Sequence, residues 1–204
     1  SGSAGKTLDV KAAIAALPAN LANAFAPDLA DEGTINGTVA VTGTPSNPTV
    51  DYRLDWANAA TSQTRGAGLS SLAIKANGLF ADNRVKLDTT VNGAGGIAIA
   101  GGGTVDLAGA KALQLAFKGR VPLAALQAKL SEQGMTAEGA ADLDLVIAGT
   151  ATQPAITGTV NLAGARLIDV RRNLTLNNLT GAIRFDGKLA TITGPGEEKI
   201  EVFM

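Results

Sequence analysis

The sequence contains no cysteine and no histidine in 204 residues. Without cysteine there is no disulfide framework, no thiolate nucleophile and no thiolate ligand for a metal. Without histidine there is no imidazole general base, no Ser-His nucleophile and no Cys/His zinc site. Most enzyme templates are therefore excluded, and our expectation is a protein that is not an enzyme and holds neither a metal nor another cofactor.

Net charge, aromatic side chains and long apolar runs are also scarce. The chain has 17 Lys and Arg against 18 Asp and Glu, so there is no basic surface for nucleic acid, which we exclude as a partner. Only 3% of residues are aromatic, and 38 residues are alanine. No run approaches the ~18 apolar residues of a spanning helix, and no signal peptide opens the chain. We read the chain as a soluble segment.

What the sequence does contain is alternation of apolar and polar residues with period 2, broken by turn residues. In residues 50–56, Val, Tyr, Leu and Trp alternate with Asp, Arg and Asp. Similar patterns at 84–88, 113–118 and 142–147, with weaker ones at 35–43, 72–77, 97–107, 156–163, 176–186 and 188–193, predict about ten strands. The apolar residues assigned to one face, and to the lining of a groove, are Val39, Val41, Val50, Tyr52, Leu54, Trp56, Ile74, Val85, Leu87, Leu115, Phe117, Leu143, Leu145, Ile147, Ile156, Val160 and Leu162.

Helical spacing occurs in two places. Pro122 is followed by Leu123, Leu126 and Leu130 and then by Gly134, the order of a helix start, an apolar stripe and a stop. The same spacing at Ile14, Leu17, Leu21 and Phe25, with Pro18 in the middle, predicts a short or broken helix.

An internal repeat organises the chain at an offset of 106 residues, as from Gly43-Thr44 to Gly149-Thr150 and from Pro48 to Pro154. Apolar positions such as Val39 and Leu145 keep the same offset. We expect one unit at 7–120 and a second, truncated unit at 121–194. Such units stack into one continuous sheet rather than two globules.

The segment Gly43–Val50, echoed by Gly149–Gly158, resembles a turn motif of the TamB family. The segment Leu176–Gly181, followed by Phe185–Leu189, is similar to the same family. The resemblance covers most of residues 7–194. Residues 1–6, beginning Ser1-Gly2-Ser3, are typical of a cloning scar, and residues 195–204 do not resemble the family, being either vector-derived or a diverged strand.

This resemblance implies an all-β fold, an elongated curled antiparallel or mixed sheet called a β-taco, with one or two short amphipathic helices. The group is AsmA-like and counted among bridge-like lipid transfer proteins. The resemblance further implies the periplasm of a Gram-negative bacterium, an inner-membrane anchor in the full-length protein, an outer-membrane barrel partner of the Omp85 type, and phospholipid as the ligand. The implied roles are phospholipid transport between the membranes and support of outer-membrane protein assembly.

Other interpretations stay open at this point. Apolar strand faces most often close into a sandwich core, although the many Gly and Ala residues make these faces too small to interdigitate along their whole length. The chain is alternatively a scaffold that binds unfolded outer-membrane strands by β-augmentation, or an adhesin-like structural repeat. Cut sheet edges predict edge-to-edge oligomers.

Two local patterns have simple explanations. Asp142 and Asp144 lie on one face of a strand, as acid/base pairs do, but a solvated outer face explains them better. The segment Gly93–Ala98 fits G-x-G-x-x-A, yet a strand-like alternation follows it where a phosphate loop requires a helix.

Overall fold

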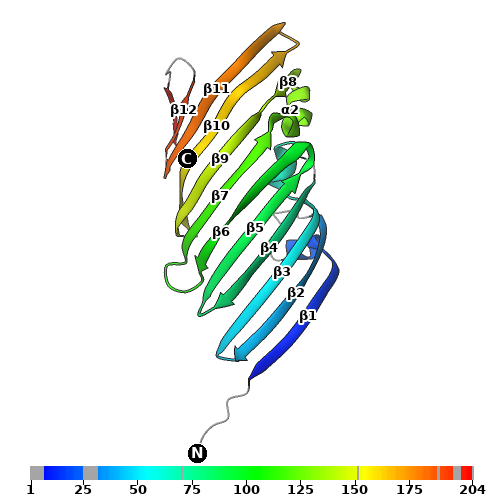
Figure 1. The fold of residues 1–204 in the computed structure, drawn as a ribbon, viewed down its shortest axis with the longest axis vertical. Coiled ribbons are helices and arrows are strands. Elements are labelled where there is room, and N and C mark those ends of the chain that lie inside the picture. Colours follow the sequence, from blue (N-terminus) through cyan, green and yellow to red (C-terminus); the bar gives the residue numbers. More distant parts are fainter. Residues whose placement is uncertain are drawn as a thin grey trace, which may run out of the picture.

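The computed structural model describes residues 7–24, 32–69, 71–150, 152–187, 189–194 and 199–203. Within these ranges, thirteen strands form one open sheet (Figure 1). The strands are β1 (Leu8–Pro18), β2 (Glu32–Thr44), β3 (Asn47–Ala60), β4 (Leu72–Ala81), β5 (Arg84–Gly93), β6 (Ile97–Asp106), β7 (Ala112–Pro122), β8 (Met135–Glu138), β9 (Ala140–Thr150), β10 (Gln153–Asp169), β11 (Leu174–Gly187), β12 (Leu189–Thr193) and β13 (Lys199–Phe203). The helical segments are η1 (Ala19–Ala24), α1 (Ser62–Gly66), η3 (Ala94–Gly96), η4 (Leu123–Leu126) and α2 (Gln127–Glu132).

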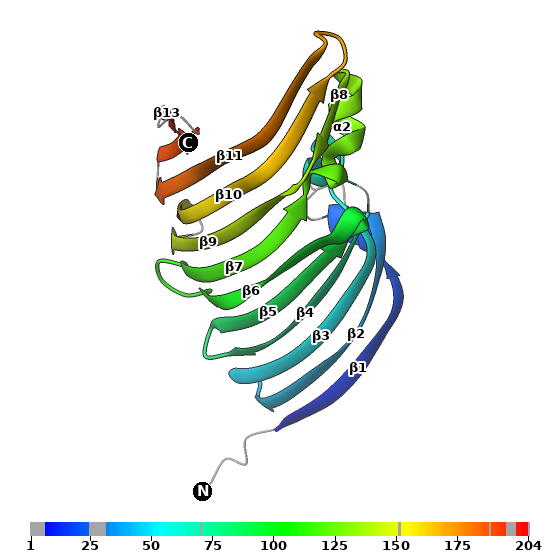
Figure 2. The same cartoon turned by 45° about the horizontal axis from the view of Figure 1, so that its top comes forward.

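The sheet is a meander in which almost every strand pairs with its neighbour in sequence. All pairs are antiparallel. The exception is β8, which pairs only with β10, so that β7 pairs with β9. Figure 2 shows the sheet curled into a trough. The predicted all-β, curled single sheet is therefore confirmed.

The helical segments gather at one end of the trough. They follow β1, β3, β5 and β7, which run in the same direction in the antiparallel meander. At this end Ala59 of β3, Leu72 of β4 and Ile97 of β6 form a small buried core, against which Trp56 of β3 and Ala125 of η4 pack. No large side chain in the described ranges is fully buried. The largest side chains on the inner face therefore stay partly exposed, and this small core lies beside η4.

Glycines let the sheet curl by making room for large neighbours. A Cβ at Gly78 would lie 1.9 Å from the Lys86 carbonyl oxygen and 2.6 Å from the Tyr52 hydroxyl. A Cβ at Gly101 would lie 2.4 Å from a ring carbon of Phe117. In both pairs the large side chain lies across the glycine of the neighbouring strand, because the two residues are Cα partners. On the inner face, a large side chain on one strand therefore lies opposite a glycine on the next strand, which keeps the two strands close together.

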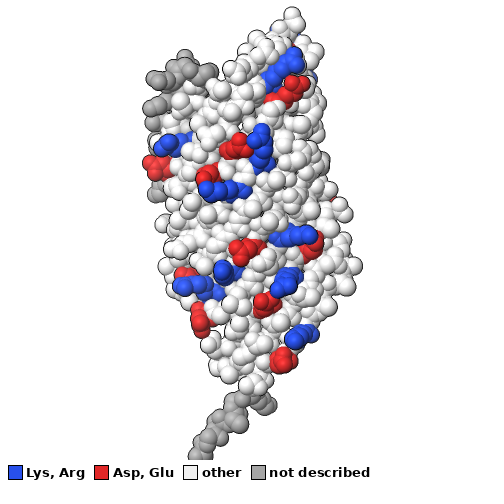
Figure 3. All heavy atoms as spheres, viewed as in Figure 1, with Lys and Arg blue, Asp and Glu red and all other residues white. Residues whose placement is uncertain are grey.

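The outer face carries the charges. Figure 3 shows both signs interspersed over it. Five ion pairs join residues that lie directly opposite each other on paired strands: Lys75 with Asp55 at 3.6 Å, Arg84 with Asp106 at 2.6 Å, Lys118 with Asp144 at 2.8 Å, Arg120 with Asp142 at 3.3 Å, and Arg166 with Glu138 at 3.7 Å. Exposed pairs contribute little stability each, but like charges at these positions would be unfavourable, so the pairs favour the observed register.

The predicted helix at Ile14–Phe25 is wrong over its first part, which is strand β1. The three-residue step from Ile14 to Leu17 faces a two-residue step from Gly37 to Ile35 in β2, so β1 contains a β-bulge. The Ala16 amide donates to Oδ1 of Asn36 at 2.8 Å within this bulge. Because of the bulge, the apolar residues Ile14 and Leu17 have the three-residue spacing of a helix although they lie in a strand. Residues 19–24 form η1, and Phe25 lies outside the described residues.

The predicted helix after Pro122 is confirmed as η4 and α2. Its apolar stripe, Leu123, Leu126 and Leu130, is half-buried. Gly134, with φ of 74°, follows the helix in the left-handed conformation expected of a stop.

The repeat recurs in conformation as well as in sequence. Gly43 and Gly149 have φ of 95° and 91°. The amide of Asn47 donates to Oγ1 of Thr44 at 3.2 Å, and that of Gln153 donates to Oγ1 of Thr150 at 3.1 Å. Threonine therefore closes the same turn in both halves, which explains why the Gly-Thr pair recurs.

The β10–β11 hairpin projects beyond its neighbours (Figures 1 and 2). Pairing with β9 ends at Leu162, and pairing with β12 covers only Ala182–Asp186 of β11. Two opposed bulges, at Gly164 and Asn178, where φ is positive, separate the projecting part from the sheet. We call residues 163–181 the overhang. Because bulges bend strands, they redirect the overhang relative to the trough.

A carboxylate organises the tip of the overhang. Asp169 is 5% exposed and accepts hydrogen bonds from the amide and the guanidinium of Arg172. The side-chain hydrogen bond from Arg172 is the main cause that holds the pKa of Asp169 below its usual value of 3.8, and the backbone hydrogen bond adds to it. A lowered pKa means that this stabilisation is present above the usual value and is lost as the pH falls through the folded value.

We expect Asp169→Asn to loosen this turn without unfolding the sheet, because the amide keeps the size of the carboxylate but loses its charge. Hydrogen exchange of residues 170–173 should be several-fold faster than in the wild type near neutral pH, while the strand amides of β3–β7 should be unchanged. Wild-type exchange at the tip should approach the mutant rate only in acid. Equal tip rates in both proteins at neutral pH would contradict the assigned role of the carboxylate.

Candidate functional site

The candidate site is the inner face of the trough. The structure places all the predicted groove residues on this face, and each of them is half-buried. Side chains of Cα partners form rows that cross the strands. One row runs through Val39, Tyr52, Gly78, Leu87, Gly103, Leu115, Ile147 and Ile156. The next runs through Gly37, Leu54, Ala76, Thr89, Gly101, Phe117, Leu145, Gly158 and Phe185.

A third row extends the face to the last strands. It contains Ile35, Trp56, Ile74, Val91, Ile99, Gly119, Leu143, Val160, Ile183 and Ile192. Within these three rows there is no Asp, Glu, Lys or Arg among the described residues. The sequence prediction omitted Val91, Ile99, Ile183 and Phe185, although they show the same alternation as the residues that it included.

The polar atoms on this face are satisfied internally. The Tyr52 hydroxyl donates to the Lys86 carbonyl at 3.3 Å, and the Trp56 indole donates to the Glu32 carbonyl at 2.8 Å. The Thr89 hydroxyl donates to the Lys75 carbonyl at 2.9 Å. Burial, and secondarily the Asp88 carboxylate, raises the pKa of Tyr52, which keeps its hydroxyl protonated. The inner face is thus chemically apolar even where it carries Tyr, Trp and Thr.

An apolar hollow of about 350 Å³ lies on this face near the overhang. Its lining includes the predicted residues Val160 and Leu162, together with Thr180 and Gly181 at the base of the overhang and Ile192 of β12. The hollow therefore combines residues of both halves of the β10–β11 hairpin with the last strands. The alternation in the sequence indicates the face on which each residue lies. It does not indicate that these residues of different strands line one hollow.

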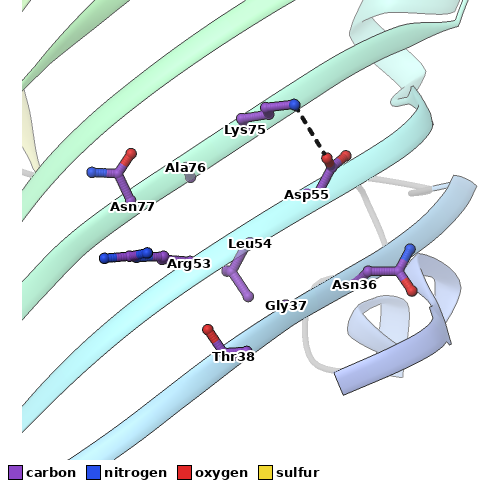
Figure 4. A pocket seen from close by; sticks show the side chains of 9 residues that line it. All are labelled: Asn36, Gly37, Thr38, Arg53, Leu54, Asp55, Lys75, Ala76 and Asn77. Atoms are coloured by element: carbon purple, nitrogen blue, oxygen red, sulfur yellow. Dashed lines mark ion pairs between the residues drawn. The ribbon is translucent and has the colours of Figure 1, made fainter. Parts of the chain in front are cut away.

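Larger hollows lie on the outer face. Figure 4 shows one of about 600 Å³, whose lining includes Arg53, Asn77 and the ion pair of Lys75 with Asp55. It lies between rows of charged and amide side chains, above the backbone of the strands. Six of its nine lining residues are charged, amide or hydroxyl side chains, whereas most residues that line the inner-face hollow are apolar. The inner face is therefore the better candidate for an apolar ligand despite the smaller hollow.

The motif-like patterns do not form chemical sites. Asp142 and Asp144 are each paired with a basic residue of β7 on the outer face. The glycine-rich segment at 93–98 leads through η3 into strand β6, as expected from its alternation. Arg171 and Arg172 lie in the turn between β10 and β11. Across the ranges that the structure describes, no three His, Cys, Asp or Glu residues are grouped to hold a metal ion.

Comparison with known proteins agrees with this architecture. The family model for the TamB C-terminal domain matches residues 3–192. No curated protein and no solved structure matches the chain. Within the described residues, no helix has both the length and the apolar character needed to cross a membrane. The match ends before the tail at residues 195–204, of which residues 199–203 form β13 beside β12. Because the family model covers nearly the whole chain, the protein belongs to the TamB family of bacterial envelope proteins.

Proposed function

We propose that the inner face of the trough shelters phospholipid acyl chains as a periplasmic segment of a longer, inner-membrane-anchored protein. In this function the chain carries lipid between the two membranes of a Gram-negative bacterium. The observation that supports it most directly is the continuous inner face: among the residues that the structure describes, its three rows carry no charge and no second sheet covers them.

The energetics are adequate for lipid without specific recognition. Burial contributes ~0.8 kcal/mol per methylene, so an acyl chain of about 16 carbons gains roughly 12 kcal/mol against water before ordering costs. A face whose own polar atoms are already hydrogen-bonded does not oppose this gain by leaving groups unsatisfied. Headgroups would remain in water at the mouth of the trough. Lipids with different headgroups are therefore equally acceptable to this face.

Partners follow from family membership. We propose an Omp85-type barrel in the outer membrane as the partner at the far end of the conduit, and support of outer-membrane protein assembly as a consequence of that partnership. This chain would contribute the wall of the conduit rather than a reactive group.

A second candidate function is favoured by the sheet edges. In the described ranges β1 pairs only with β2, and β13 pairs only with β12. An unpaired edge accepts another strand by β-augmentation, either from an unfolded outer-membrane protein or from a second copy of this chain. The adhesin interpretation requires a closed core, whereas this sheet is open.

Site-specific crosslinking in cells tests the proposed function. A photoreactive amino acid at Leu54, on the inner face, should crosslink to phospholipid, whereas the same amino acid at Leu79 should not. Leu79 is the matched control because it is a leucine of the adjacent strand, 40% exposed on the outer face. We expect the lipid adduct at Leu54 to exceed that at Leu79 by about ten-fold, because an acyl chain gains apolar contact only inside the trough. Equal yields at the two positions, or peptide adducts alone at Leu54, would contradict lipid carriage.

A further inference from the structure

The overhang has a surface unlike the rest of the protein. At its tip Val170 is 70% exposed, Leu174 45% and Leu176 37%. Val170 lies in the turn, and the two leucines follow in β11. The stretch 174–181 contains no charged residue. Over residues 174–181, β11 pairs on one side with β10, and its other side is unpaired within the part of the chain that the structure describes. The tip therefore presents apolar side chains outward on a narrow projection.

The charge around the tip is positive once ion pairs are counted. The carboxylates of Asp169, Glu138 and Glu132 pair with Arg172, Arg166 and Lys129, respectively. Arg171 has no carboxylate partner among the described residues, and its Nη2 donates to the Glu132 carbonyl oxygen at 3.0 Å. A cation without a counter-ion thus lies beside the most exposed apolar residue of the tip.

The tip is held in place rather than free. The Val170 amide donates to the Gly134 carbonyl at 3.0 Å, and Arg171 connects the turn to the end of α2. Strand β8 pairs with the last residues of β10. The projection therefore keeps its apolar residues and its cation together without the help of a partner.

We propose that the overhang tip inserts into the surface of an anionic lipid bilayer. A convex, narrow apolar tip lacks the pockets that anchor protein partners, whereas the soft interface of a bilayer accepts such a shape. Exposed Val and Leu enter the acyl boundary while a neighbouring arginine remains at the level of anionic headgroups. Because Arg171 is a cation, we expect the tip to bind an anionic bilayer more tightly than a neutral one.

Insertion would bring the trough next to the bilayer. The inner-face hollow reaches Thr180 and Gly181, at the base of the overhang. Membrane contact at the tip does not depend on lipid binding inside the trough. Only the idea that lipid enters or leaves the trough at the overhang tip rests on the proposed function.

The test is co-sedimentation of the full chain with vesicles of phosphatidylcholine containing phosphatidylglycerol, and with vesicles of phosphatidylcholine alone. We expect the wild type to prefer the anionic vesicles. Val170→Asp should reduce binding to them by about ten-fold or more, because a carboxylate is repelled by the headgroups and does not enter the acyl boundary. Arg171→Gln should remove the preference for anionic vesicles, and Arg171→Lys should retain it.

Leu107→Asp is the matched control. Leu107 is 50% exposed in the turn between β6 and β7, at the opposite end of the strands. This variant should bind vesicles like the wild type. Thermal unfolding of Val170→Asp should match the wild type, since the side chain is mostly in water.

Three outcomes would overturn the proposal: no vesicle binding by the wild type, equal loss in Leu107→Asp and Val170→Asp, or a lipid-free dimer that Val170→Asp dissociates in sedimentation. The last would identify the tip as a protein contact. Lipid crosslinking at Leu54 is measured separately, so failure at the tip is distinguishable from failure of lipid carriage in the trough.

Discussion

Gly78→Ala should lower the free energy of unfolding by about 3 kcal/mol, near the upper range for overpacking a well-packed site. The added methyl group would lie 1.9 Å from the Lys86 carbonyl oxygen, which belongs to the backbone of β5 and cannot move alone. It would also meet the Tyr52 ring and hydroxyl, which lie across this glycine. For a chain of this size the melting temperature should fall by roughly 6–12 °C.

Gly66→Ala provides the control for Gly78→Ala. Gly66 is the last residue of α1, and a Cβ there would meet no atom within 4 Å. Its substitution should be neutral or should stabilise by a few tenths of a kcal/mol, because alanine favours helix more than glycine does. Similar melting temperatures for the two variants would show that the close packing of β3, β4 and β5 is not needed for stability.

Leu145→Asp should abolish lipid adducts at Leu54 while leaving the protein folded. Leu145 lies in the same row as Leu54, between its Cα partners Phe117 and Gly158. A carboxylate there interrupts the apolar path and requires water that an acyl chain would have to displace. Because Leu145 is half-buried on an open face, the carboxylate still reaches solvent, and the loss of stability should be about 1–2 kcal/mol rather than the larger cost of a closed core.

Val146→Asp is the matched control because Val146 is the next residue of β9 and is 41% exposed on the outer face. It should retain both the lipid adduct and the fold. Adduct yield is compared by mass spectrometry of the crosslinked band, and folding by thermal unfolding of the purified variants. Full adduct yield in Leu145→Asp would exclude a continuous apolar path, and global unfolding of this variant would indicate that the inner face is a closed core.

The face on which each strand residue lies was predictable, because the alternation of apolar and polar residues depends only on which side of the sheet faces solvent. The row from Val50 to Trp56 lies on the inner face as its spacing indicates. The Gly-Thr turns were predictable for a similar reason, since glycine in a left-handed conformation and a threonine hydroxyl close the turn locally. Neither inference requires knowledge of distant contacts.

The remaining features depend on pairing between distant segments. The bulge at Ile14–Leu17 has helical spacing in sequence, and only its pairing with β2 shows that it is a strand. The overhang arises because β9 and β12 are shorter than the hairpin between them, a difference that no single segment encodes. The same holds for Tyr52 lying across Gly78, which depends on the register of β3 with β4.

The meander order also determines how the chain can fold. From β1 to β7 each strand pairs with the strand made just before it, across connections of 2 to 13 residues. Loop-closure entropy is therefore small at each step, and the sheet can lengthen at one growing edge from the amino-terminal strands onward. Only β8 must wait, because its partner β10 follows β9 in the chain. The sheet can thus be assembled in the order of its strands, with growth at one edge while β1 remains the other edge.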